Sequence, residues 1–118
     1  MSSELVSLDI QERDGIVVAR VEGELDIAGA GRTGDAIAEA VPATARGLVV
    51  DFSGLDFIDS SGVAMLFALA RQLGNRRQQL RLVSPGGSPV TRVLDIVDFG
   101  RAAPIDESLD AALAGLAE

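Results

Sequence analysis

The 118-residue chain contains no cysteine, no histidine and no lysine, and tyrosine and tryptophan are also absent. Without cysteine the chain has neither disulfides nor thiolate metal sites. Without histidine it lacks the commonest metal ligand and the usual general base, so a Ser-His-Asp triad cannot form within it. No nucleophile–base pair is evident. The sequence therefore predicts a protein that is not an enzyme and that uses no metal and no cofactor.

Positive charge is also scarce, because ten basic residues face 18 acidic ones and the formal net charge is −8. This excess of negative charge disfavours nucleic acid and anionic membranes as partners. No apolar run approaches the ~20 residues that a membrane span needs. The first four residues lack the basic and apolar segments of a signal peptide. These features predict a soluble, acidic, cytoplasmic protein.

The pattern of apolar residues favours one globular domain over residues 1–118, with no linker and no internal repeat. Runs typical of strands alternate with amphipathic helical patterns, which predicts an α/β fold. We expect a mixed, mainly parallel β-sheet of four to five strands, accompanied by about four helices. The expected strands cover residues 6–11, 16–21, 48–52, 80–83 and a short edge at 102–105. The expected helices cover residues 33–41, 63–73, 89–97 and 107–116.

Turn and capping residues mark several boundaries of these elements. Asp14-Gly15 is typical of the turn in a hairpin. Residues 23–27 are expected to form a bend with a short extended piece. Ser88 followed by Pro89 predicts the start of a helix, and Asp106 is the predicted N-cap of the last one.

The most informative stretch is Asp56-Phe57-Ile58-Asp59-Ser60-Ser61-Gly62, which joins a buried strand to a long helix. A helix start needs one capping residue, and Asp59 or Ser60 can fill that role. The acid and the two hydroxyls together exceed what capping requires. We therefore expect Asp59 and Ser60 to hold the helix start and Ser61 to be free for chemistry. Gly62 is expected to let the backbone of another protein come close.

The helix after this stretch has two contrasting faces. Its predicted core stripe is Val63, Leu66, Phe67, Ala70 and Leu73. Ser61 lies roughly on the opposite side, using about 100° per residue. Its expected neighbours there are Ala64, Met65, Ala68 and Gln72. We expect this small, apolar strip to be exposed and to form a surface on which a protein docks.

A competing interpretation concerns Gly29-Ala30-Gly31-Arg32-Thr33-Gly34, which fits the pattern G-x-G-x-x-G before a helix. Phosphate oxygens would sit at the helix N-terminus, and Asp51 is placed where a ribose-binding acid is expected. Gly23, Glu24 and Asp26 interrupt the strand that should precede the first glycine, which weakens this interpretation. A nucleotide-binding domain that uses Gly29–Gly34 stays open as an alternative.

Three motifs in sequence order resemble the STAS domain, named for sulfate transporters and anti-sigma factor antagonists. They are Leu48–Phe52 with Phe57–Gly62, the earlier Gly23-Glu24-Leu25-Asp26, and the later Ser84-Pro85 followed by Val90–Val97 and Phe99. The resemblance spans nearly the whole chain and is to the stand-alone bacterial members, since no transporter is attached. It implies a single STAS-like domain.

The resemblance also implies a function. In the stand-alone members the second serine of the motif accepts phosphate from an anti-sigma factor, which is an ATP-dependent serine kinase. Carried over, Ser61 is the phosphoacceptor, and Asp26 and Asp59 match positions near the docking site. The full partner-binding set that we predict is Asp26, Asp59, Ser60, Gly62, Ala64 and Met65.

The resemblance implies a cycle in which the unphosphorylated antagonist binds the anti-sigma factor and frees the sigma factor. Phosphorylation ends the complex, and a metal-dependent serine phosphatase restores the antagonist. An alternative is a STAS scaffold without a switch, as a subunit of a transport or stress-signalling complex. Both alternatives are binding modules rather than enzymes.

Overall fold

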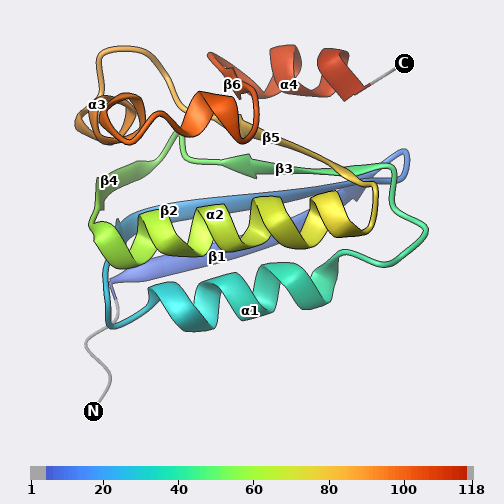
Figure 1. The fold of residues 1–118 in the computed structure, drawn as a ribbon, viewed down its shortest axis with the longest axis horizontal. Helices are drawn as coiled ribbons and strands as arrows, with labels where there is room; N and C mark the ends of the chain where they lie inside the picture. Colours follow the sequence, from blue (N-terminus) through green and yellow to red (C-terminus); the bar gives the residue numbers. More distant parts are fainter. Residues whose placement is uncertain (1–4, 117–118) are drawn as a thin grey trace.

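The computed structural model describes residues 5–116, and within them six strands form one mixed sheet flanked by helices (Figure 1). The strands are β1 (Val6–Arg13), β2 (Ile16–Leu25), β3 (Gly47–Asp51), β4 (Leu55–Ile58), β5 (Gln79–Val83) and β6 (Ile105–Asp106). The helices are α1 (Ala30–Ala40), α2 (Ser60–Asn75), α3 (Pro89–Ile96), the 3-10 helix η1 (Phe99–Arg101) and α4 (Leu109–Leu116). The predicted α/β fold is confirmed.

The sheet has the order β1-β2-β3-β5-β6, and β4 pairs with β2 beyond the end of β3. Among the described strands, β1 and β2 pair antiparallel, and the other pairings are parallel. The prediction of a mixed, mainly parallel sheet is therefore confirmed. The hairpin turn is confirmed as well, with Asp14 and Gly15 at φ values of +54° and +84°.

The sequence did not reveal β4, and it ended β2 too early. In β4 the two central residues, Asp56 and Phe57, are both exposed, so the strand has no regular alternation of buried and exposed residues. β2 continues through Gly23, where a bend was expected. Gly23 has a φ of +96°, and the pairing register with β4 shifts there, so the strand distorts without ending.

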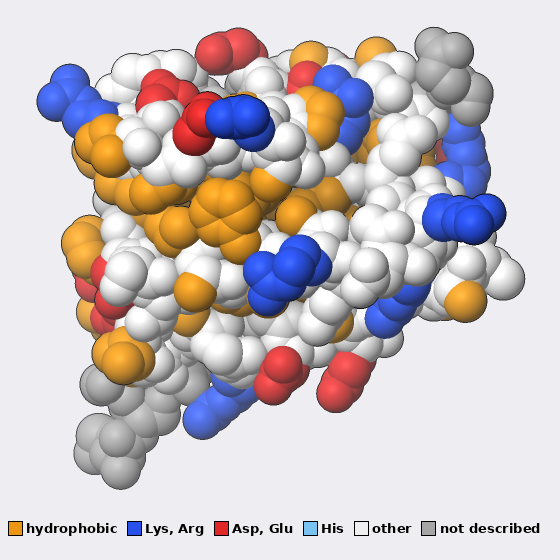
Figure 2. Space-filling view, in the orientation of Figure 1, with side chains coloured by type: hydrophobic (Ala, Val, Ile, Leu, Met, Phe, Trp, Pro, Cys, Tyr) orange, Lys and Arg blue, Asp and Glu red, His pale blue; other side chains and the backbone are white. Residues whose placement is uncertain are grey.

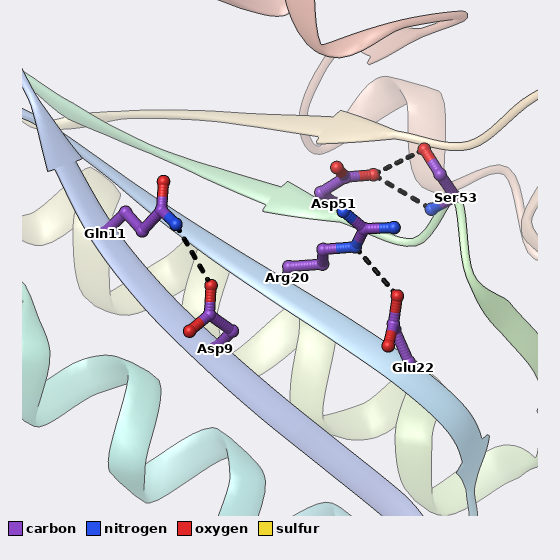
Figure 3. A network of polar contacts seen from close by, with 6 residues as sticks. All are labelled: Asp9, Gln11, Arg20, Glu22, Asp51 and Ser53. Carbon is purple, nitrogen blue, oxygen red and sulfur yellow. Dashed lines mark hydrogen bonds and ion pairs between the residues drawn. The ribbon is translucent and has the colours of Figure 1, made fainter.

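Two hydrophobic clusters lie on opposite faces of the sheet, because alternate residues of a strand point to opposite sides. Helices α1 and α2 cover the larger cluster. Helix α4 covers part of the other face, where Ala112 and Leu116 pack on Ile16, Val18 and Val49. The rest of that second face is polar (Figure 3), with α1 and α2 behind the sheet. There Gln11 contacts Asp9, Arg20 contacts Glu22, and Ser53 contacts Asp51.

The predicted cap at Ser88 is confirmed, because its Oγ accepts a hydrogen bond from the Thr91 amide at 3.0 Å. The predicted cap at Asp106 is wrong. Asp106 belongs to the edge strand β6, where it accepts two hydrogen bonds from Arg81 at 2.9 and 3.1 Å. These bonds raise the pKa of Arg81 above its ordinary value, although partial burial opposes the change. Ser108 caps α4 instead, accepting from the Ala111 amide at 3.1 Å.

Candidate functional site

The parallel pairing of β2 with β4 brings Asp26 and Asp59 to neighbouring positions. Leu25, the last residue of β2, lies opposite Ile58, the last residue of β4. The Asp59 amide also donates to the Leu25 carbonyl at 3.2 Å. Because the carboxyl ends of parallel strands meet at one edge of a sheet, the two acids that follow these strands share this edge.

Asp59 is the N-cap of α2, as expected. Its Oδ1 accepts hydrogen bonds from the amides of Ser61, at 2.8 Å, and Gly62, at 3.2 Å. Its carbonyl oxygen accepts from the Val63 amide at 3.0 Å. Ser60 is the first helical residue and is exposed. One carboxylate therefore satisfies the amides of Ser61 and Gly62 in the first turn, without help from the Ser60 hydroxyl.

Asp26 organises the entry to α1 in a similar way. Its Oδ1 accepts from the Ala28 amide at 3.0 Å. Its carbonyl oxygen accepts from the amides of Gly29, at 3.1 Å, and Ala30, at 2.8 Å. The half-buried Asp26 therefore has a structural role at this turn, beside the docking role that the sequence suggested.

A groove of about 510 Å³ lies between α1 and α2, and Ser61 is one of its lining residues. Its lining consists of Ile27, Ala30, Gly31, Gly34, Asp35, Ser61, Ala64, Met65, Ala68, Leu69 and Gln72. Most of these side chains are small or apolar, and the described lining includes one charged group, Asp35. Ile27 is 82% exposed, so the lining includes a large apolar side chain that is open to solvent. A groove of this size accepts part of another molecule.

The expectation that Met65 is exposed is wrong, because its side chain is only 7% exposed. Helix α1 covers it: a Cβ atom on Gly34 would lie 2.5 Å from the Met65 Cγ atom, so the two helices meet closely there. Ala64 is exposed as expected. Leu69 is also buried, although the predicted core stripe omitted it. The buried face of α2 is thus wider than one stripe, because α1 as well as the sheet packs on it.

The role proposed for Gly62 is also wrong. Gly62 is buried, and a Cβ atom there would lie 2.6 Å from Ile58 Cγ1 and 2.9 Å from the Leu25 carbonyl oxygen. The missing side chain therefore lets α2 approach the ends of its own domain's strands β2 and β4. It leaves no open path for the backbone of a partner.

The structure argues against a nucleotide site at Gly29–Gly34. Gly31 and Gly34 lie within α1, so they form no phosphate-binding loop before it. The Gly29 and Ala30 amides already bond to Asp26. Asp51 is on the opposite face of the sheet and is 6% exposed, and its Oδ1 accepts from the Ser53 amide and hydroxyl at 2.9 and 2.6 Å.

A second apolar feature lies on the face that Figure 2 displays, as a strip between α2 and the segment formed by α3 and η1. Phe67 of α2 meets Phe99 of η1 edge to face, with ring centroids 5.1 Å apart. On α3, Ile96 is 76% exposed. Phe99 is 0% exposed, and Phe67 packs against the core as predicted but is only partly buried, so Phe67 is the member of this pair that reaches the surface.

The described part of the chain holds no cluster of three or more residues placed to bind a metal ion. The carboxylates of Asp26 and Asp59 accept backbone hydrogen bonds instead. None of the helices within residues 5–116 is long and apolar enough to cross a bilayer. The candidate site is the groove between α1 and α2. Ser61 is part of its lining, and Asp26 and Asp59 lie at the adjacent edge of the sheet.

Comparison with known proteins gives the family. The family model for the STAS domain matches residues 7–112. The chain belongs to the STAS family. This STAS domain is 31% identical over 113 residues to the anti-sigma-F factor antagonist RsfA of Mycobacterium tuberculosis, covering 94% of this chain and 88% of the relative.

Solved structures agree with this assignment. An anti-sigma factor antagonist from Mycobacterium paratuberculosis superposes with a TM-score of 0.86 at 26% identity, covering 96% of this chain and 95% of the other. The Bacillus cell fate determinant SpoIIAA in its phosphorylated form superposes with a TM-score of 0.71 at 26% identity, covering 93% and 99%. The structure of SpoIIAA in its unphosphorylated form has the same fold, with a TM-score of 0.71 at 23% identity.

Proposed function

We propose that this STAS domain is an anti-sigma factor antagonist and that phosphorylation of Ser61 ends its binding to the anti-sigma factor. The position of Ser61 carries the proposal. It is the second residue of α2, is partly exposed, and lines an apolar groove. The names of its relatives and the phosphorylated form of SpoIIAA support the proposal.

In the proposed cycle the unphosphorylated domain binds an anti-sigma factor, and the sigma factor is released. The anti-sigma factor is an ATP-dependent serine kinase and transfers phosphate to Ser61. A serine phosphatase then restores the binding form. The domain catalyses no step itself, and the cycle places it in the cytoplasm with the transcription machinery.

The proposed docking surface surrounds Ser61. Asp26 and Asp59 border it at the sheet edge, Ser60 is exposed beside it, and Ala64 lies one turn further along α2. Met65 belongs to the wall of the groove. Gly62 contributes indirectly, because its missing side chain lets α2 pack closely against β2 and β4.

The switch requires no large movement. A phosphoryl group on Ser61 adds about −1.5 to −2 charges. Two unit charges ~6 Å apart interact by ~0.7 kcal/mol in water and by ~3 kcal/mol at an effective dielectric constant of ~20. A partner acid that faces Ser61 would therefore meet several kcal/mol of repulsion, which lowers affinity by about a hundredfold or more. Local charge and lost packing are sufficient.

The test uses the cognate anti-sigma factor kinase with ATP, followed by phosphopeptide mapping. Phosphate on Ser61 is expected, and none on the Ser61→Ala variant. Ser61→Ala should bind the kinase with or without ATP, whereas Ser61→Asp should bind it poorly. Ser60→Ala is the matched control for the phosphorylated position and should still accept phosphate at Ser61. Modification at Ser60 alone would contradict the assignment.

The same experiment separates the proposal from a STAS scaffold without a switch. A scaffold subunit would copurify with its assembly and would accept no phosphate at Ser61. Its binding would also be insensitive to Ser61→Asp.

A further inference from the structure

We infer that Asp59 denies a phosphoryl group on Ser61 the backbone amides of Ser61 and Gly62 at the α2 N-terminus, so that the new charge is displayed at the groove. The inference rests on the proposed phosphorylation of Ser61 and concerns how that modification acts. It makes Asp59 a positioning residue for the phosphoryl group, in addition to a helix cap.

A phosphate ordinarily binds favourably at a helix N-terminus, because the free amides donate to its oxygens and the helix dipole favours negative charge. Here the amides of Ser61 and Gly62 already donate to one oxygen of Asp59, at 2.8 and 3.2 Å. The next amide, that of Val63, donates to the Asp59 carbonyl at 3.0 Å. A phosphoryl group on Ser61 therefore finds these donors occupied by a group that is itself negative.

The other charged groups beside Ser61 are also acids. Asp26 follows β2, and Asp59 follows the neighbouring strand β4. Asp35 of α1 lines the same groove as Ser61. Arg32, the nearest cation along α1, already has an interaction partner of its own. The carboxylates beside a phosphoryl group on Ser61 thus come from the cap, from the β2–α1 turn and from α1, and α1 also carries the cation Arg32.

Two consequences distinguish this arrangement from an ordinary phosphate at a helix start. Amide donors favour the dianion and lower the second pKa of the phosphate, whereas neighbouring carboxylates disfavour the dianion and raise that pKa. The phosphoryl group also stays outside the helix end, where a docking partner meets it directly. The direction of the pKa change therefore reports which arrangement exists.

The experiment places phosphoserine at position 61 of the full chain by genetic encoding or by ligation, without any kinase. Titration followed by ³¹P NMR then gives the second pKa of the phosphate. We expect it above the ordinary value of about 6. Each carboxylate at ~6 Å in water contributes about half a unit. The amide protons of Ser61 and Gly62, from ¹H–¹⁵N spectra, give a second measurement: ionisation of the phosphate should not move them strongly downfield, as a hydrogen bond to the phosphate would.

Three variants make the test specific. Asp59→Asn keeps a good capping residue and removes one charge, so the phosphate pKa should fall by about half a unit. Asp35→Asn should lower it by a smaller amount. Asp110→Asn, on α4 across the sheet, is the control and should leave it unchanged.

A wild-type pKa at or below the ordinary value, or a strong downfield shift of these amide protons as the phosphate ionises, would overturn the inference. So would an Asp59→Asn variant with the wild-type phosphate pKa. Because no kinase is used, a kinase that ignores Ser61 would defeat the proposed function without changing these results.

Discussion

Gly34 of α1 faces Met65 of α2 so closely that a Cβ atom on Gly34 would lie 2.5 Å from the Met65 Cγ atom. This contact sets the distance between the two helices that form the groove. It also explains why Met65 is buried while Ala64, one position earlier, is exposed. The groove beside Ser61 therefore depends on a glycine that the sequence suggested for phosphate binding.

The first prediction compares Gly34→Ala with Gly31→Ala. Both glycines lie within α1, where alanine is favoured by up to ~1 kcal/mol. A Cβ atom on Gly31 would meet no heavy atom within 4 Å apart from the adjoining backbone of α1, so its replacement should raise the free energy of unfolding by about that amount. At Gly34 the new methyl group meets Met65, and overpacking of this kind costs about 1–3 kcal/mol. Urea unfolding should therefore find Gly34→Ala less stable than Gly31→Ala by at least ~1 kcal/mol. Equal stabilities would show that α1 can move away from α2 without cost.

The second prediction concerns Gly62→Ala. The added Cβ would lie 2.9 Å from the Leu25 carbonyl oxygen, a backbone atom held in β2, so relief requires α2 to shift. We expect a loss of about 1–3 kcal/mol in the free energy of unfolding. Gly74→Ala is the matched control in the same helix, because no heavy atom lies within 4 Å of its Cβ position. A Gly62→Ala variant as stable as the control would show that α2 can shift on β2 and β4 without cost.

The third prediction concerns the cap of α2. Asp59→Ala removes the acceptor for the Ser61 and Gly62 amides and should lower the free energy of unfolding by about 0.5–2 kcal/mol. Asp59→Asn should retain most of that stability, because asparagine caps about as well as aspartate. Ser60→Ala removes an exposed hydroxyl next to the cap and should change stability by less than ~0.5 kcal/mol. Thermal and urea unfolding measure all three, and a larger loss for Ser60→Ala than for Asp59→Ala would move the cap to Ser60.

The elements with regular patterns could be predicted from the sequence. Residues 6–11 and 16–21 were correctly predicted as strands, and the start of α3 at Pro89 was recognised, because local alternation and capping chemistry determine them. The cap at Asp59 was predictable for the same reason, since it depends on residues within one helical turn. The position of Ser61, two residues after the cap, could be predicted in the same way.

The errors have a common cause, which is contact between segments far apart in the sequence. Met65 was expected to be exposed because one stripe of α2 was expected to be buried, whereas Gly34 allows a second helix to cover another stripe. Gly62 was misread because its neighbours, Leu25 and Ile58, come from two other strands. The groove itself could not be predicted, because it depends on the packing of α1 against α2. The small residues on both helices nevertheless indicate close helix packing.

The last prediction tests the groove as part of the proposed docking surface. Ala68 lines the groove one turn beyond Ala64, so Ala68→Phe should fill much of the space that a partner side chain would occupy. We expect a loss in affinity for the cognate anti-sigma factor of about tenfold or more, as for a change at the centre of an interface. Ala36→Phe is the matched control, because Ala36 is exposed on α1 and does not line the groove. Calorimetric titration with the unphosphorylated variants measures the difference. Wild-type affinity in Ala68→Phe would place the partner's contacts at the sheet edge around Asp26 and Asp59 rather than in the groove.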